Sequence, residues 1–165
     1  MKKLKHISVI VLLLTFSYII VLKTGNKTEI AKELNITLNT SNLITYKDSH
    51  DKFHGDGLTY AEIRLGKKDY DLLVNTLQSG SKWTAYPLSD IIEILLYGKN
   101  GQGPYIKDPE ITLSTPQITS GYYFFNPVSD FPEDTEELSH GFSTNVTIAL
   151  FDKNNGMLYY YKYDS

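Results

Sequence analysis

An uncharged run of sixteen residues near the N-terminus, Ile7 to Leu22, constrains this chain more than any other feature. Three lysines precede the run, and Lys23 follows it. Its length falls between a signal-peptide core of about 7–15 residues and a spanning helix of about 17–25. No small-residue cleavage pattern follows the run, because Val21 and Leu22 are bulky. We therefore predict an uncleaved signal-anchor over residues 1–23, with a cleaved signal as the alternative.

The basic end of such a segment stays in the cytoplasm, so the rest of the chain should face outward. We expect a single-pass protein of the cell membrane with its C-terminal domain outside, secreted if the signal is cleaved. A buried helix of a soluble protein is the remaining alternative for the apolar run.

The charge of the chain is distributed unevenly. Residues 1–23 hold four of the 16 basic residues and none of the 19 acidic ones, which leaves the remainder at −7. An acidic domain repels phosphate backbones, so we expect no nucleic-acid partner. The chain has no cysteine, which excludes disulfides, thiol nucleophiles and cysteine-ligated zinc.

Residues 24–42 are polar and are interpreted as a stalk, and residues 43–165 as one extracytoplasmic domain. Alternating or continuous apolar residues predict strands, and apolar residues three and four apart predict helices. The predicted strands are 43–47, 58–65, 121–125, 142–151 and 157–163, and the predicted helices are 69–77 and 91–97. Asn155-Gly156 is the strongest hairpin signal in the chain.

This order of elements lacks the strand–helix alternation of a parallel sheet. We therefore predict an α+β fold, with an antiparallel sheet of about five strands and two short helices on one face. The N-terminal membrane helix is additional to this domain.

Two of the four histidines and several aspartates lie between the first two predicted strands. Two imidazoles and neighbouring carboxylates can bind a divalent metal, with a third imidazole from a later loop. Gly55 and Gly57 make the segment a hairpin loop rather than a helix, so a plain polar loop is the competing interpretation. The candidate metal ligands are Asp48, His50, His54, Asp56 and His140.

Tyrosines are concentrated on the later predicted strands. If one face of the sheet is open, alternate tyrosines form an exposed recognition surface. The candidate surface residues are Tyr122, Tyr159, Tyr161 and Tyr163. If both faces are covered, these tyrosines belong to the core instead.

A resemblance to a group of known proteins rests on three parts of the chain: the runs Asp48 to Tyr60 and Gly121 to Phe125, and the tyrosine-rich terminal hairpin. The chain from about residue 43 to 163 resembles small uncharacterised signal-anchored extracytoplasmic proteins of Gram-positive bacteria. The resemblance implies a compact domain outside the membrane and no particular activity.

Two functional hypotheses follow. The first is a membrane-tethered module that binds a protein, peptide or envelope component. The second is a divalent-metal domain, with hydrolysis as one use of the metal. No G-x-S-x-G or phosphate-binding glycine pattern is present, so the first, non-enzymatic hypothesis is favoured and no cofactor is firmly implied.

Overall fold

The computed structural model describes residues 24–50, 55–78, 82–113, 115–127, 131, 138 and 145–165. The chain divides into two compact units, residues 1–38 and 39–165. In the first unit, residues 24–33 form a helix. The unit boundary falls inside the segment 24–42 that the sequence predicted as a stalk.

The predicted membrane segment, residues 7–22, lies outside the described residues. Within the described ranges, no helix has both the length and the apolar character needed to cross a bilayer.

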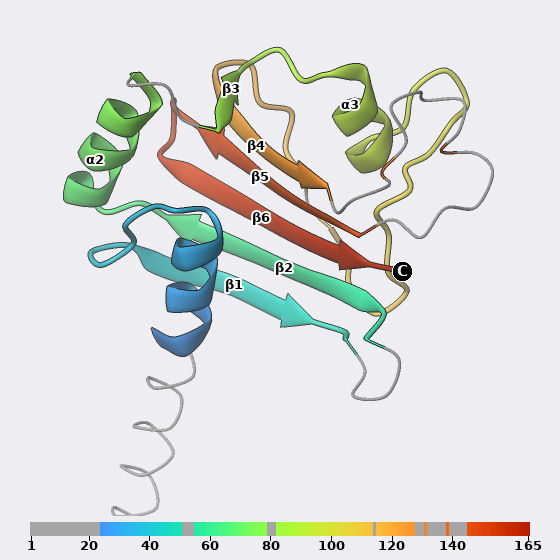
Figure 1. Ribbon diagram of the computed structural model, residues 1–165, viewed down its shortest axis with the longest axis horizontal. Coiled ribbons are helices and arrows are strands. Elements are labelled where there is room, and N and C mark those ends of the chain that lie inside the picture. The colour runs from blue at the N-terminus through green and yellow to red at the C-terminus, as the bar shows by residue number, and fades with distance from the viewer. Residues whose placement is uncertain are drawn as a thin grey trace, which may run out of the picture. The chain divides into compact units, whose positions relative to one another are not determined.

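The second unit is an α+β domain built on a six-stranded sheet, in which every neighbouring pair of strands is antiparallel (Figure 1). Along the chain, its elements are β1 (Asn42–Asp48), β2 (Gly57–Arg64), α2 (Lys67–Gln78), β3 (Trp83–Ala85), α3 (Asp90–Leu96), β4 (Gly121–Pro127), β5 (Val146–Asp152) and β6 (Met157–Asp164). The strand order in space is β1-β2-β6-β5-β4-β3. The α+β class and the antiparallel sheet are confirmed, and the sheet has six strands rather than about five.

The turn predicted at Asn155-Gly156 joins β5 to β6. Gly156 has a positive φ of 67°, which glycine adopts without a steric penalty. The Asn155 side chain accepts a hydrogen bond from the Met157 amide at 2.9 Å. The register then pairs Asp152 with Met157 and continues to Val146 with Tyr163.

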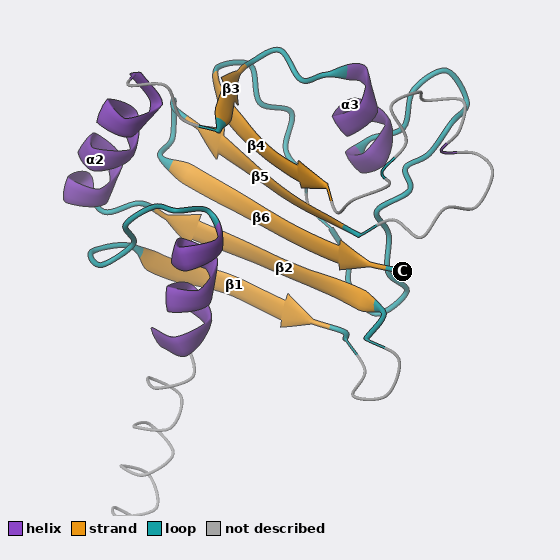
Figure 2. Cartoon of the chain, in the orientation of Figure 1, coloured by secondary structure: helices purple, strands orange, loops and turns teal. Residues whose placement is uncertain are grey.

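Helices α2 and α3, drawn in purple in Figure 2, pack on opposite faces of the sheet through Tyr70 and through Ile92 and Leu95, although the sequence placed both on one face. Residues of α3, among them Ile92 and Leu95, share a core cluster with Leu150 of β5. On α2, the Tyr70 ring packs edge-on against Phe151, with 5.5 Å between ring centroids. Because consecutive residues of a strand point to opposite faces, Leu150 and Phe151 place the two helices on different sides.

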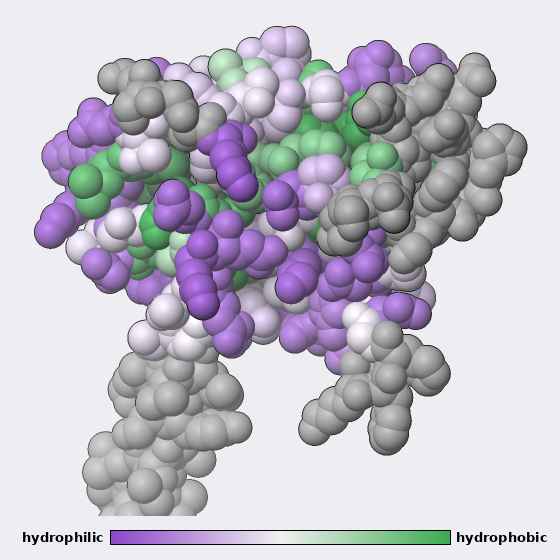
Figure 3. Space-filling view, viewed as in Figure 1, coloured by the Kyte–Doolittle hydropathy of each residue, from purple (hydrophilic) through white to green (hydrophobic). Residues whose placement is uncertain are grey.

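Both faces of the central strands are therefore buried. Six of the seven residues of β5 are buried, and only Asp152 is partly exposed. A strand covered on both faces is typically a continuous apolar run, as Val146 to Phe151 nearly is. The surface in Figure 3 is mainly hydrophilic, with hydrophobic residues showing over α2, the helix that carries the exposed Leu72.

Candidate functional site

His50 lies two residues after the end of β1, beside the start of β2. The backbone of Gly57 approaches it so closely that a Cβ atom on Gly57 would lie 2.6 Å from the His50 Cα atom. Ser49 links the end of β1 to the start of β2, because its backbone amide donates a hydrogen bond to the Leu58 carbonyl at 3.1 Å. The Ser49 hydroxyl also donates to Asp108 Oδ2 at 2.6 Å. The backbone of residues 49–50 is thus held against the start of β2 and beside Asp108.

The His50 ring bridges two carboxylates. Its Nδ1 atom lies 2.6 Å from Asp48 Oδ1, and its Nε2 atom lies 3.0 Å from Asp164 Oδ2 at the end of β6. The His50 side chain is 20% exposed, against 42% for Asp48 and 28% for Asp164. An imidazolium donates to both carboxylates, whereas a neutral imidazole donates to one.

The pKa of the Asp48 carboxyl reflects this contact. Partial burial raises the pKa, but hydrogen bonds from the His50 side chain and backbone act against it. The His50 charge and a hydrogen bond from the Thr59 hydroxyl lower the pKa further. The net effect holds the pKa of Asp48 below its usual value of 3.8.

The structure brings together only part of the predicted metal-binding set. Asp48 and His50 are in contact, and Asp56 is exposed directly before β2. His54 and His140 lie outside the described residues. In the described part of the chain, no group of three or more histidines and carboxylates is arranged to hold a metal ion. Both His50 nitrogens already contact carboxylates, so in the described residues the His50 side chain links the end of β1 to the end of β6.

The predicted tyrosine surface is wrong for two of its four members. Tyr161 is fully buried and Tyr159 is 8% exposed, because both belong to the core cluster that α3 covers. Tyr122 and Tyr163 are half-buried. The prediction required one open face on the sheet, and both faces are covered along these strands.

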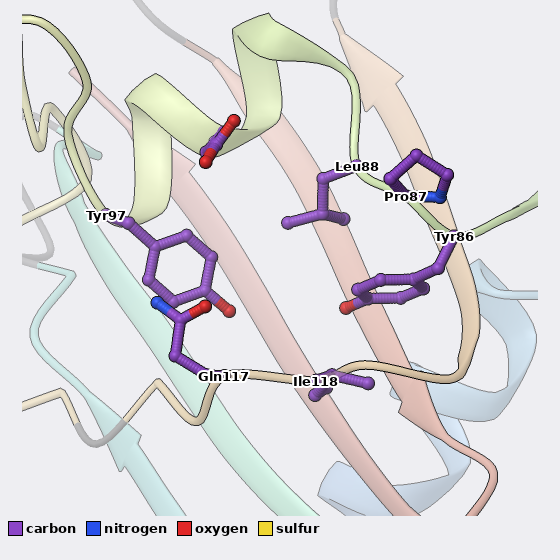
Figure 4. A pocket seen from close by; sticks show the side chains of 7 residues that line it. Tyr86, Pro87, Leu88, Tyr97, Gln117 and Ile118 are labelled. Atoms are coloured by element: carbon purple, nitrogen blue, oxygen red, sulfur yellow. The ribbon is translucent and has the colours of Figure 1, made fainter.

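A cavity of about 170 Å³ lies beside α3, over the face of the sheet that this helix covers (Figure 4). Three segments form it: the residues after β3, helix α3, and the extended segment that leads into β4. Its lining residues are Tyr86, Pro87, Leu88, Glu93, Tyr97, Gln117 and Ile118. The two tyrosines, from different segments, direct their hydroxyl groups toward one another across the cavity (Figure 4).

Both tyrosine rings are fixed from outside the cavity. The Tyr86 amide donates to the Gly121 carbonyl at 3.1 Å, and its ring packs edge-on against Tyr123. The Tyr97 amide donates to the Glu93 carbonyl at 2.8 Å, at the C-terminal end of α3. The distance between the two rings is therefore set by the sheet and by α3.

The two hydroxyl groups differ in their hydrogen bonding. Tyr97 donates to the Pro116 carbonyl at 2.8 Å. The Tyr86 hydroxyl is buried and has no hydrogen-bond partner among the described residues. A buried hydroxyl without a partner costs about 1–3 kcal/mol, so its presence calls for an explanation.

Both phenols are neutral at physiological pH. Burial, with smaller contributions from Tyr97 and Asp152, raises the pKa of Tyr86 far above its usual value of 10.0. Burial, followed by the charges of Tyr159 and Glu93, raises the pKa of Tyr97 to about 12. The cavity therefore offers hydroxyl groups and not phenolates.

The formal charge on the cavity lining, at Glu93, is compensated. Lys99 Nζ donates to Glu93 Oε2 at 2.7 Å and to Asp90 Oδ1 at 3.0 Å. Hydrogen bonds from Lys99 to Glu93 and then Asp90 raise the pKa of this lysine, which keeps it charged. The rim of the cavity is polar but holds no uncompensated anion among its described residues.

Tyr97 also lines a second cavity of about 340 Å³, together with residues that include Lys107, Asp108 and Ile111. Its Asp108 carboxylate already has structural partners, the Ser49 hydroxyl and the amides of Glu110 and Ile111. Two tyrosine hydroxyls, those of Tyr86 and Tyr161, are buried with no hydrogen-bond partner among the described residues. Of these two residues Tyr86 lines the smaller cavity, which makes that cavity the better candidate site.

Sequence reasoning did not find Tyr86, Tyr97 and Gln117 as site residues. They come from three segments, and no spacing in the sequence links them. The chain matches no family model, no curated protein and no solved structure.

Proposed function

We propose that this protein is a membrane-tethered binding module whose domain outside the cytoplasm holds a small chemical group between Tyr86 and Tyr97. The group would belong to a protein, peptide or envelope component. The observation that supports this most directly is the buried Tyr86 hydroxyl, which faces the cavity and has no partner among the described residues. Binding sites retain such groups at a cost in stability when a ligand completes their hydrogen bonds.

The geometry of the cavity suits binding better than reaction. The two tyrosine hydroxyls are neutral, and the Glu93 carboxylate is held by Lys99. General acid–base catalysis requires a group whose pKa lies near the working pH. Raising both tyrosine pKa values moves these groups away from that range.

Binding is tested by nuclear magnetic resonance on the full chain in detergent micelles. A panel of small fragments is added, and the amide signals of the residues around the cavity are followed. We expect some fragments to shift Leu88, Tyr97 and Ile118 while leaving the α2 signals unchanged. If every fragment leaves those three amides unperturbed, the cavity is not a binding site.

The tethering half of the proposal rests on the apolar run of residues 7–22 and its flanking lysines. Because the chain has no cysteine, single cysteines can report which side of the membrane a position occupies. Asn154→Cys lies in the exposed turn before β6, and Lys3→Cys lies before the apolar run. A membrane-impermeant maleimide applied to intact bacteria should label Asn154→Cys and spare Lys3→Cys. The reverse pattern, or equal labelling, would contradict an outward-facing domain.

A further inference from the structure

We infer that the cavity between Tyr86 and Tyr97 accepts a neutral ring of phenol size that carries one hydroxyl group. This inference rests on the proposed binding function and names the chemical class of the ligand. Three independent features of the cavity support it: its hydrogen-bonding groups, its size and apolar wall, and its charge.

The two tyrosine hydroxyls match a single ligand hydroxyl, and the side chains of Gln117 and Glu93 complete the polar part of the lining. Tyr97 donates its hydroxyl proton to the Pro116 carbonyl, so toward the cavity it presents only oxygen lone pairs, which accept. Tyr86 has no acceptor among the described residues, and its hydroxyl is covered by neighbouring atoms, so a ligand that accepts its proton must displace them. A ligand hydroxyl placed between them accepts from Tyr86 and donates to Tyr97 (Figure 4). One donor and one acceptor are what a hydroxyl group requires.

The size of the cavity fits one six-membered ring. Its volume is about 170 Å³. A cavity of about 150 Å³ lined by apolar side chains accommodates benzene. An apolar wall for a ring is supplied by Pro87, Leu88 and Ile118. The hydroxyl groups of a sugar placed against this wall would find no hydrogen-bond partners there.

The charges around the cavity favour a neutral ligand. Glu93 is paired with Lys99, so neither supplies a free charge to a ligand. The domain as a whole is acidic, since residues 24–165 carry −7. An anionic ring such as benzoate would be repelled by this field and would find no cation in the described lining.

The test compares four probes on the full chain in micelles: phenol, toluene, benzoate and glucose. Amide shifts of Leu88, Tyr97 and Ile118 report binding at the cavity. Phenol should bind with a dissociation constant on the order of 1 mM, as is usual for a ligand of this size. Toluene should bind about 3- to 10-fold more weakly, because it lacks the hydroxyl.

The Tyr86→Phe variant removes the hydroxyl group but keeps the ring, so it tests the effect of the hydroxyl apart from the shape of the cavity. This variant should weaken phenol binding about 3- to 10-fold and leave toluene binding unchanged. Tyr70→Phe is the matched control, since it removes a tyrosine hydroxyl bonded to Lys153 on the opposite face of the sheet. It should leave the affinity for phenol as it is in the wild type.

The outcomes distinguish this inference from the proposed function. If toluene binds as tightly as phenol, or if Tyr86→Phe binds phenol normally, the hydroxyl assignment is overturned. If benzoate or glucose shifts the cavity amides more strongly than phenol, the ligand class is wrong and the binding function stands. If none of the probes, nor any fragment of the wider panel, shifts those amides, both proposals fail.

Discussion

His50 Nε2 lies 3.0 Å from Asp164 Oδ2, which joins two residues that are 114 positions apart in the chain. His50 follows the edge strand β1, whereas Asp164 is the last residue of β6, two strands away in the sheet. The strand between them, β2, begins at Gly57, whose backbone contacts the His50 backbone. The imidazole therefore connects the ends of three neighbouring strands at one corner of the sheet.

His50→Ala should destabilise the domain by about 1 kcal/mol. The variant removes two hydrogen bonds to carboxylates, and partial exposure of the three side chains limits their strength. Urea denaturation followed by circular dichroism measures the change. Lys67→Ala is the control, because Lys67 pairs with Asp71 on the exposed side of α2. It should change stability by less than about 0.5 kcal/mol, and a similar loss in both variants would argue against the corner contact.

Asp48 should make stability fall at acidic pH. Its pKa in the folded state lies below the value of 3.8 for a free aspartate. A group of this kind stabilises the fold above its unfolded pKa, and the contribution is lost as the pH falls through the folded pKa. The Asp48→Asn variant should therefore lose less stability than the wild type between pH 5 and pH 3. Because Asp48 is 42% exposed, we expect the difference to stay below about 1 kcal/mol. Parallel pH slopes for the two proteins in urea denaturation would contradict the assignment.

Gly57 and Gly55 should respond differently to alanine. A Cβ atom on Gly57 would lie 2.6 Å from both the N and Cα atoms of His50, and backbone atoms cannot yield as a side chain can. We expect Gly57→Ala to cost at least about 2 kcal/mol. Gly55 has a φ of 76°, but no described atom lies within 4 Å of the Cβ position. Gly55→Ala should cost only about 1 kcal/mol, the penalty for a left-handed backbone. Thermal melts of the two variants decide the order.

The sequence predicted the parts of the fold that depend on local chemistry. The Asn155-Gly156 turn is an example, because a two-residue preference determines it. The three-residue strand β3 was not among the predicted strands, since it forms only by pairing with β4 at the sheet edge. The placement of helices on both faces was also missed. Strand β5 carries the sequence signal for this placement, because its nearly unbroken apolar run is typical of a strand buried on both sides.

The candidate sites depend on contacts that local spacing does not encode. His50 was a candidate because it shares a loop with His54 and several aspartates, whereas its contacts in the described residues are Asp48 and the distant Asp164. Tyr159 and Tyr161 were expected to be exposed, but the core cluster that includes α3 buries them. The Tyr86–Tyr97 cavity requires three segments to converge, which only the tertiary structure shows.

Tyr86→Phe and Tyr97→Phe should have opposite effects on stability, although both remove one hydroxyl at the same cavity. The Tyr86 hydroxyl is buried with no partner among the described residues, so its removal should stabilise the protein by about 1–3 kcal/mol. Tyr97 loses a hydrogen bond to the Pro116 carbonyl, and its variant should be destabilised by about 1 kcal/mol. Urea denaturation without added ligand measures both. Equal destabilisation of the two variants would show that Tyr86 has a partner of its own.

Asp69→Ala should be the most damaging of these changes. The Asp69 side chain is 1% exposed, and its Oδ2 atom accepts hydrogen bonds of 2.7 Å from the Thr40 amide and the Ser41 hydroxyl. These contacts fasten the first turn of α2 to the segment that enters β1. Removing a buried charged acceptor with two donors costs about 2–4 kcal/mol. Asp71→Ala, which alters an exposed aspartate two residues along the same helix, should cost less than about 0.5 kcal/mol. Both values come from urea denaturation, and a loss below about 1 kcal/mol for Asp69→Ala would mean that these hydrogen bonds do not hold α2 in place.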